Sequence, residues 1–272
     1  MKLVVDAGST KIEWAVLQSD GSTHTFESPG VNALMLSEEQ LCDTFGEALH
    51  NIYNKNITAI YYYGAGCATA ETCNKVLRAL PQAPVIEVHS DLLGAARALF
   101  GSNPGLAGII GTGSNTGLYD GTSIKANMSP LGYILGDEGS GTAMGRELLR
   151  KVYRYGFMRQ EFETWLGGDY NDVLQRIYRQ PGANAFLASL TRFVTEHRTK
   201  CNAVITDTFN PLFTRLREFY GPQVKDVAFV GGLAHAFDKE ITDTAQSFGF
   251  NVTKILNRPM TGLVEYHKTL YK

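Results

Sequence analysis

Long apolar runs, paired cysteines and an excess of one charge are all scarce in this chain of 272 residues. No stretch of about 18 consecutive apolar residues occurs, so the sequence predicts no membrane-spanning helix. Lys plus Arg number 25 and Asp plus Glu number 27, and the resulting net charge of −2 argues against nucleic acid or an anionic membrane surface as a partner. The four cysteines are spaced too widely for a compact zinc or redox clip, which indicates reduced thiols and no structural metal.

Common signatures of phosphate and zinc sites are missing as well. The chain has no G-x-x-x-x-G-K-[ST] loop, and Gly111 to Gly113 lack both the G-x-G-x-x-G spacing and the following helix of a dinucleotide-binding fold. The six histidines show no H-E-x-x-H spacing, so zinc catalysis has no support. The N-terminal apolar stretch meets Asp6 almost at once, which predicts a buried strand and not a signal peptide. We therefore expect a cytoplasmic protein.

Alternating strand and helix patterns predict an α/β protein. The composition, 44% hydrophobic and 19% charged, is that of a core-forming chain. Residues 37–40 form a capping box ahead of an apolar helical face, and further helices are expected over 91–100, ending at Gly101, and from about Thr142. Short apolar runs of strand length occur at 3–5, 57–63, 85–88, 106–110 and 227–230.

One short unit occurs twice. Each copy consists of a strand, a Gly-Ser loop, a second strand and a tight Asp-Gly turn, and the copies cover residues 3–21 and 108–121. Glycine is also concentrated around the second copy, since twelve of the 28 glycines lie between Gly101 and Gly145. Such a concentration indicates close approach of the backbone to a ligand or to another segment. Two copies predict two similar subdomains, with a boundary in the turn-rich segment 101–105.

The two Gly-Ser loops carry a resemblance to a known family. Val4 to Lys11 look like the first phosphate motif of the sugar kinase, Hsp70 and actin superfamily, Gly111 to Asn115 look like the second, and Phe229 to Gly232 look like the adenosine motif. Within that superfamily, the second loop followed by Leu131 to Ser140 is similar to the N-acetylglucosamine kinases, which are grouped with the BadF/BadG/BcrA/BcrD ATPases. The motifs run in the expected order from residue 3 to about Gly262.

This resemblance implies an architecture, a catalytic carboxylate and a carboxylate for the metal. It implies two ribonuclease-H-like, actin-like ATPase subdomains, residues 1–103 and 104–272, around an interdomain cleft. From the residues alone, Asp6 is a turn former after a strand and Asp91 is an acid in the first turn of a helix. By resemblance, Asp6 orients Mg²⁺, and Asp91 is the general base that receives the proton of the sugar 6-hydroxyl.

The other candidate residues lie in loops, where turn formation or helix entry would also explain them. By resemblance, the contacts to ATP fall on Gly8, Ser9, Thr10, Gly111, Thr112, Gly113, Gly231 and Gly232. The contacts to the sugar fall on Asn32, Ser114, Asn115 and Asp137. Leu131 stands where the mammalian kinases carry an aromatic residue, which leaves the preferred sugar open.

The sequence therefore predicts an ATP- and Mg²⁺-dependent kinase that converts an amino sugar to its 6-phosphate. N-acetylglucosamine is the first candidate for this sugar. Glucosamine and N-acetylmuramic acid stay open as alternative acceptors. The oligomeric state also stays open, with a homodimer as one possibility. A BadF-type ATPase that acts on no sugar is a second hypothesis, although the chain lacks a Cys-Ala-Ala-Gly-Thr-Gly type motif for an iron–sulfur cluster. A third is a binding module without turnover, which would keep the glycine loops and would not need Asp91.

Overall fold

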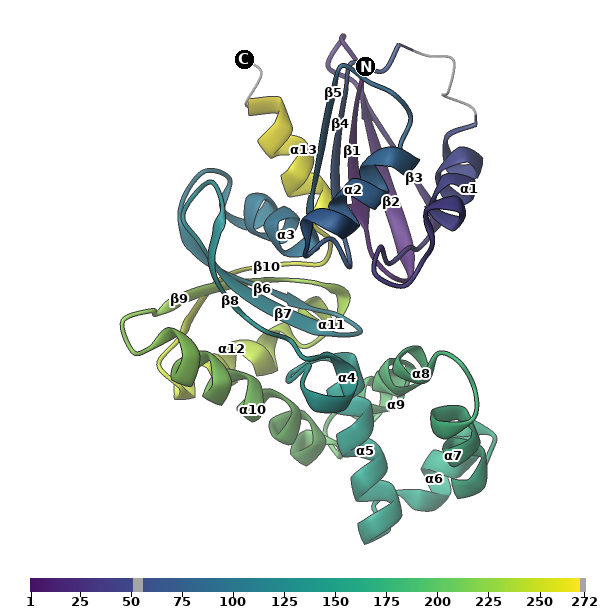
Figure 1. Ribbon diagram of the computed structural model, residues 1–272. Helices are drawn as coiled ribbons and strands as arrows, with labels where there is room; N and C mark the ends of the chain where they lie inside the picture. The colour runs from purple at the N-terminus through teal and green to yellow at the C-terminus, as the bar shows by residue number, and fades with distance from the viewer. Residues whose placement is uncertain (51–55, 270–272) are drawn as a thin grey trace. The chain divides into compact units, whose positions relative to one another are not determined.

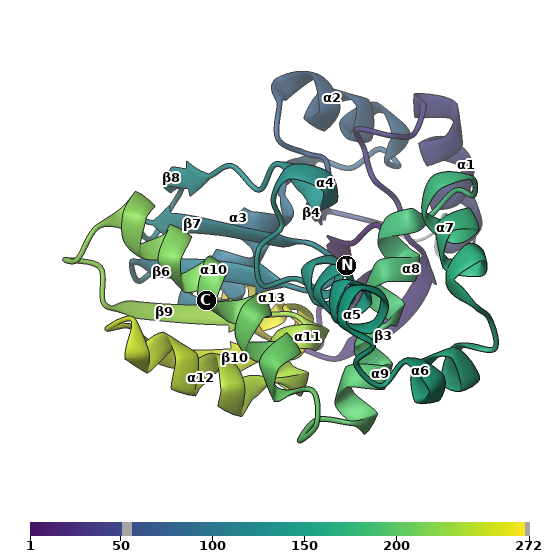
Figure 2. The ribbon, with the colours of Figure 1, turned by 90° about the horizontal axis from the view of Figure 1, so that it is seen from below.

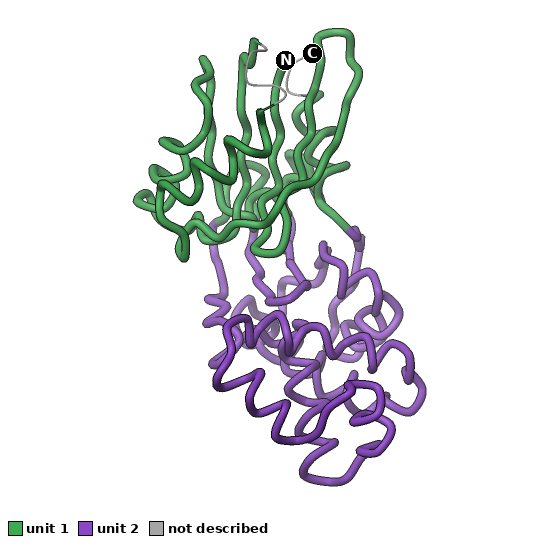
Figure 3. The backbone as a smooth tube through the Cα atoms, turned by 90° about the vertical axis from the view of Figure 1, so that its right-hand side faces the viewer, with its two compact units in different colours: residues 1–104, 119–124, 258–272 green, residues 105–118, 125–257 purple. Residues whose placement is uncertain are grey.

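The computed structural model describes residues 1–50 and 56–269 of the chain. Contacts divide the chain into two compact units, shown in different colours in Figure 3. Unit 1 comprises residues 1–104, 119–124 and 258–272, and unit 2 comprises residues 105–118 and 125–257. None of the helices in the described ranges combines the length and the apolar character needed to cross a bilayer.

Unit 1 is built on a five-stranded sheet with the strand order β3-β2-β1-β4-β5. Strand β1 pairs antiparallel with β2 and parallel with β4, and β4 pairs parallel with β5, so β1, β4 and β5 end at the same edge of the sheet. The strands are β1 (Lys2–Ala7), β2 (Lys11–Leu17), β3 (Thr23–Pro29), β4 (Ala59–Gly64) and β5 (Val85–Ser90). The helices are α1 (Glu38–Leu49), α2 (Ala70–Ala79), α3 (Asp91–Phe100) and α13 (Met260–Thr269).

Unit 2 contains a second five-stranded sheet with the order β10-β9-β6-β7-β8, which matches the first sheet strand for strand in chain order. Helices α10 and α12 run along the sheet, and α5 to α9 gather as a group at one side of it (Figure 2). The strands are β6 (Gly105–Ile110), β7 (Ser114–Tyr119), β8 (Ile124–Met128), β9 (Asp226–Val230) and β10 (Asn251–Leu256). The helices are α4 (Gly132–Leu135), α5 (Gly141–Tyr155), α6 (Arg159–Leu166), α7 (Tyr170–Tyr178), α8 (Ala183–Ser189), α9 (Thr191–Glu196), α10 (Asn202–Tyr220), α11 (Gly232–Ala236) and α12 (Asp238–Ser247).

The α/β prediction and the internal repeat are confirmed. Both Asp-Gly turns form with glycine at positive φ, at Gly21 (84°) and Gly121 (100°). The Ser37 hydroxyl accepts from the Gln40 amide while the Gln40 side chain accepts from the Ser37 amide, so α1 begins with the predicted capping box. Helix α3 ends at Gly101 as expected, and the Gly101 amide donates to the Arg97 carbonyl.

The last helix packs in a unit that the sequence did not assign to it. The sequence placed residues 104–272 together, whereas α13 packs against α3 and β1 of unit 1 (Figure 1). The backbones come close because residue 262 is glycine: a Cβ there would lie 2.3 Å from the Ala98 carbonyl oxygen. His267 anchors the same helix, since its Nε2 lies 2.8 Å from the Tyr63 hydroxyl.

Candidate active site

Two carboxylates lie at the edge of the first sheet where its parallel strands end. Asp6 is the penultimate residue of β1, and Asp91 follows the last residue of β5 and opens α3. In register, Ala7 pairs with Gly64 and Gly64 pairs with Ser90, which brings both acids to this edge. The structure thus places the predicted metal-orienting residue and the predicted base at the same end of one sheet.

Burial raises the pKa of both acids, and nearby negative charges raise that of Asp6 further. The pKa of Asp6 is raised to about 7, first by burial and then by the negative charges of Asp91 and Glu13, against a smaller lowering by Lys11. The pKa of Asp91 is also raised by burial, and hydrogen bonding to the Leu92 amide opposes that rise. Asp91 Oδ1 accepts from that amide at 2.8 Å. Asp91 therefore accepts a hydrogen bond at the start of α3, as expected of an acid in a first helical turn. This bond does not offset the effect of burial on the pKa of Asp91.

Glu13 is a site residue that the sequence interpretation missed. It pairs directly with Asp6 across β1 and β2, so the two side chains share one face of the sheet. Its carboxylate also lies 3.9 Å from Arg258 Nη1. The alternation of β2 carries the signal, because Ile12 and Trp14 are buried while Glu13 lies between them on the opposite face.

The first glycine loop is a tight hairpin with exposed hydroxyls. The Gly8 amide donates to the Lys11 carbonyl at 2.9 Å, and Ser9 and Thr10 are exposed at the tip. The Lys11 side chain pairs with Glu27 at 2.7 Å. The hairpin thus presents a small residue and two hydroxyls to solvent.

Asn32 is fixed against this hairpin. Its Nδ2 donates to Ser9 Oγ at 3.2 Å, and its Oδ1 accepts from the Leu34 amide at 3.0 Å. Gly66 makes room for it, because a Cβ at residue 66 would lie 2.3 Å from Asn32 Oδ1. Asn32 therefore joins the first loop to the end of β4, at the same sheet edge as the two acids.

In unit 2 the second glycine loop is tied to the start of α5. The amides of Gly141 and Thr142 donate to the carbonyls of Gly111 and Thr112 at 2.8 and 3.0 Å. Gly111 also donates to the Gly113 carbonyl at 2.9 Å, which closes the turn. A Cβ at Gly111 would meet nothing within 4 Å, so this side of the turn is open.

Asp137 approaches the second loop closely. A Cβ at Gly113 would lie 2.9 Å from Asp137 Oδ2, and the carboxylate accepts a hydrogen bond from the Ser114 amide. Burial raises the pKa of Asp137, and so does Glu138, while the Ser114 amide and the Arg146 charge lower it. The backbone of Asp137 is left-handed, with φ of 57°, which is uncommon for a residue other than glycine.

Ser114 and Asn115 already have partners within unit 2. Ser114 Oγ donates to the Glu138 carbonyl at 2.8 Å, which links the loop to the Asp137 segment. Asn115 Oδ1 accepts from Asn127 Nδ2 at 2.8 Å, so its own amide group is left as the donor. The two predicted sugar contacts thus help to hold the site together.

The two glycines after β9 differ in their surroundings. Gly231 has φ of 135°, and a Cβ there would lie 2.2 Å from the Ile110 carbonyl oxygen, so packing alone requires glycine. Gly232 is exposed, with only Asn257 Oδ1, 3.9 Å away, near its Cβ position. This segment lies beside the strand that leads into the second loop.

The structure therefore brings the predicted residues together in two groups, one in each unit. The group in unit 1 consists of Asp6, Gly8, Ser9, Thr10, Asn32 and Asp91. The group in unit 2 consists of Gly111, Thr112, Gly113, Ser114, Asn115, Asp137, Gly231 and Gly232. Within the described ranges, no group of three or more His, Cys, Asp or Glu side chains could hold a metal ion by itself.

Comparison with solved structures identifies the family. A provisionally assigned N-acetylglucosamine kinase from Porphyromonas gingivalis is 33% identical over the whole of both chains, with a TM-score of 0.92. The chain belongs to the N-acetylglucosamine kinase-like proteins of the BadF/BadG/BcrA/BcrD ATPase family. The family predicted from the glycine loops is thus confirmed. No family model and no curated protein matches the chain.

Solved structures of lower sequence identity share the fold. A provisionally assigned N-acetylglucosamine kinase from Chromobacterium violaceum is 18% identical over 97% of this chain and 98% of its own, with a TM-score of 0.76. A ROK family glucokinase from Streptomyces griseus, solved with glucose and AMPPNP, is 13% identical over 98% of both chains, with a TM-score of 0.56. The N-acetylglucosamine kinase-like chain therefore has the α/β fold of the actin-like ATPase sugar kinases.

Proposed function

We propose that the protein is an ATP- and Mg²⁺-dependent kinase that phosphorylates the 6-hydroxyl of N-acetylglucosamine, with Asp91 as the general base. Its membership of a sugar kinase family gives the coarser part of this conclusion, an ATP-dependent sugar kinase. The choice of N-acetylglucosamine rests on the similarity to the Porphyromonas gingivalis protein. The position of Asp6 and Asp91 at one sheet edge, where the charge of Asp91 acts on Asp6, is the observation that supports the catalytic roles.

The surroundings of Asp91 support its role as the base. A base must take a proton from an alcohol as the oxygen attacks phosphorus, and a carboxylate with a raised pKa accepts that proton more readily than an exposed one. Burial raises the pKa of Asp91 in this way. The Leu92 amide holds one carboxylate oxygen at 2.8 Å, which fixes the orientation of the group.

The residues around Asp6 fit a Mg²⁺ ion. Burial raises the pKa of Asp6 to about 7, and the negative charges of Asp91 and Glu13 add to the rise. A nearby cation would relieve the repulsion among these carboxylates. Mg²⁺ usually takes one or two carboxylates together with phosphate and water, which suits a site without a full set of protein ligands. When bound, the ion would neutralise charge on the phosphates of ATP.

The remaining residues support binding of the two substrates. The hairpins at Gly8 to Thr10 and Gly111 to Gly113 offer backbone amides and hydroxyls of the kind that hold phosphates. Asn32, Asn115 and Asp137 offer amide and carboxylate groups for sugar hydroxyls. Gly231 and Gly232 would accommodate adenosine against the backbone.

A coupled ADP-release assay with Mg-ATP and a panel of hexosamines tests this function. N-acetylglucosamine is expected to give the highest kcat/KM, and glucosamine and N-acetylmuramic acid extend the panel to the two other acceptors. Asp91→Asn should lower kcat/KM by about 10²- to 10⁴-fold, because the variant cannot accept the proton.

Asp43→Asn is the matched control, since Asp43 is exposed on α1, and it should keep wild-type activity. A panel in which no sugar raises ADP production contradicts the kinase activity. Wild-type turnover by Asp91→Asn contradicts the assignment of the base and leaves the kinase activity intact.

A further inference from the structure

The segment that carries Asp137 is a closed loop under backbone strain. The Asp137 amide donates to the Pro130 carbonyl at 2.9 Å, and Gly136 lies so close that a Cβ there would be 2.1 Å from the same oxygen. Leu131 and Asp137, at the two ends of the loop, have φ of 59° and 57°. Such a conformation persists only where surrounding contacts hold it.

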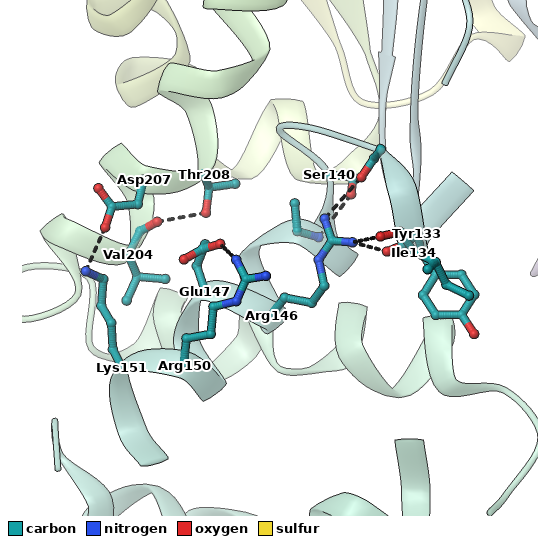
Figure 4. A network of polar contacts seen from close by, with 12 residues as sticks. Tyr133, Ile134, Ser140, Arg146, Glu147, Arg150, Lys151, Val204, Asp207 and Thr208 are labelled. Atoms are coloured by element: carbon teal, nitrogen blue, oxygen red, sulfur yellow. Dashed lines mark hydrogen bonds and ion pairs between the residues drawn. The ribbon is translucent and has the colours of Figure 1, made fainter. Parts of the chain in front are cut away.

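Arg146 supplies those contacts from the neighbouring helix. It lies in α5 and reaches across to α4, the four-residue helix inside the loop (Figure 4). Its Nη1 donates to the Tyr133 carbonyl, and its Nη2 donates to the Gly136 carbonyl at 3.1 Å. The last carbonyls of so short a helix have no partners within it, and a planar guanidinium can bind two of them at once.

The charge of Arg146 acts on the same carboxylate. Asp137 is 8% exposed, and its carboxylate faces Gly113 and the Ser114 amide. Among charged groups, Arg146 lowers the pKa of Asp137 and Glu138 raises it. Glu138 in turn lies 4.0 Å from Arg215. Arg146 is therefore the positive charge that favours the ionised form of Asp137.

We propose that Arg146 is a positioning residue for the sugar: it holds the loop at residues 130–137 so that the Asp137 carboxylate can accept hydrogen bonds from a sugar hydroxyl. This inference rests on the proposed sugar kinase activity. Arg146 does not touch the substrate in this scheme. It acts through the backbone of the loop and through the charge of Asp137.

Arg146→Met is expected to raise the KM for the sugar by about 10- to 100-fold, with a smaller change in kcat, because a displaced carboxylate binds the hydroxyl poorly. Removal of the positive charge should also raise the pKa of Asp137 further. Since only the ionised carboxylate accepts without donating, the acidic limb of sugar binding should move to higher pH. It is measured as the pH dependence of the sugar Kd in an Asp91→Asn background, so that titration of the base does not contribute. Arg146→Lys keeps the charge but loses the two-pronged contact, so it should raise the KM with the limb near its wild-type position.

Arg150→Met is the matched control, because Arg150 lies one turn later on α5 and pairs with Glu147 on its own helix. This variant should keep the wild-type KM and pH profile. Wild-type values for Arg146→Met, or changes no larger than those of Arg150→Met, would overturn the proposal. An Arg146→Lys limb displaced as far as that of Arg146→Met would overturn the role of the charge.

Hydrogen exchange separates this proposal from the proposed function. Amides of residues 130–137 should exchange faster in Arg146→Met than in wild type and Arg150→Met, whether or not a sugar is turned over. If wild type phosphorylates no sugar but the exchange result holds, the proposed kinase activity is wrong, while the proposal that Arg146 holds the loop at residues 130–137 is supported. Equal exchange in all three proteins would contradict the proposal that Arg146 holds this loop.

Discussion

At the scale of single residues, neighbouring positions with the same side chain have different structural demands. Gly231 and Gly232 both matched an adenosine motif, and only the first is required by packing. The sequence could not separate them, because the requirement at Gly231 comes from the Ile110 carbonyl on a strand more than a hundred residues earlier in the chain. Glu13 was missed for a different reason, because its signal is local: the alternation of β2 and the hairpin register with Asp6 place it beside that acid.

Paired alanine substitutions test this difference. Gly231→Ala should lower the free energy of unfolding by roughly 3 kcal/mol, because its φ of 135° suits glycine alone and the new Cβ would meet the Ile110 carbonyl oxygen at 2.2 Å. Gly232→Ala should leave stability nearly unchanged but raise the KM for ATP by roughly tenfold, if adenosine packs there. Urea unfolding and steady-state kinetics measure the two effects. Equal losses of stability in both variants would contradict the distinction.

At the scale of elements, local patterns were sufficient where the determinants are local. The capping box of α1 and the end of α3 at Gly101 each depend on residues within one or two turns, and both are as predicted. The position of α13 depends on Gly262 and His267 contacting residues far away in the chain. No pattern inside residues 260–269 specifies those contacts, so the packing of this helix could not be inferred.

His267 should make the stability of unit 1 depend on pH. Burial lowers the pKa of His267 to about 3, helped by the positive charges of Arg97, Lys2 and His89. In the unfolded chain a histidine takes up a proton near its ordinary value, so stability is present above about pH 6.5 and is lost as the pH falls toward 3. The loss is about 1.4 kcal/mol per pH unit for one proton, a few kcal/mol between pH 7 and 4.

The measurement is urea unfolding at pH 7 and 4, followed by Trp14 fluorescence in a Trp165→Phe background so that the signal reports unit 1. His267→Gln should reduce the pH dependence, because the variant has no proton to exclude. His24→Gln, at an exposed position of β3, should behave as wild type. The same pH dependence in all three proteins would show that His267 is not the titrating group.

At the scale of the whole molecule, helix α13 follows the last strand of unit 2 in the sequence but packs in unit 1. Met260, Leu263 and His267 of α13 are buried, and the helix packs on α3, which begins with Asp91. The family and the two-sheet fold were predictable because the glycine loops and their order are written in the sequence. The division into units was not, because it depends on which surfaces α13 covers.

A chain that ends at residue 257 tests the importance of this packing. Deleting residues 258–272 should lower the unfolding midpoint reported by Trp14 substantially, since buried apolar surface on α3 and β1 would be exposed to water. The midpoint reported by Trp165 in unit 2, measured in a Trp14→Phe background, should change little. An unchanged Trp14 midpoint would mean that unit 1 is complete without α13.

The identical strand order of the two sheets also shows where the halves have diverged. Between the third and fourth strands, the described residues of unit 1 form the single helix α1, whereas those of unit 2 form α4 to α10 between Met128 and Asp226. Both sheets tolerate this inequality without any change of pairing order. The connection between the third and fourth strands can therefore differ greatly in length and helix content while the hydrogen-bonded order of the five strands stays constant.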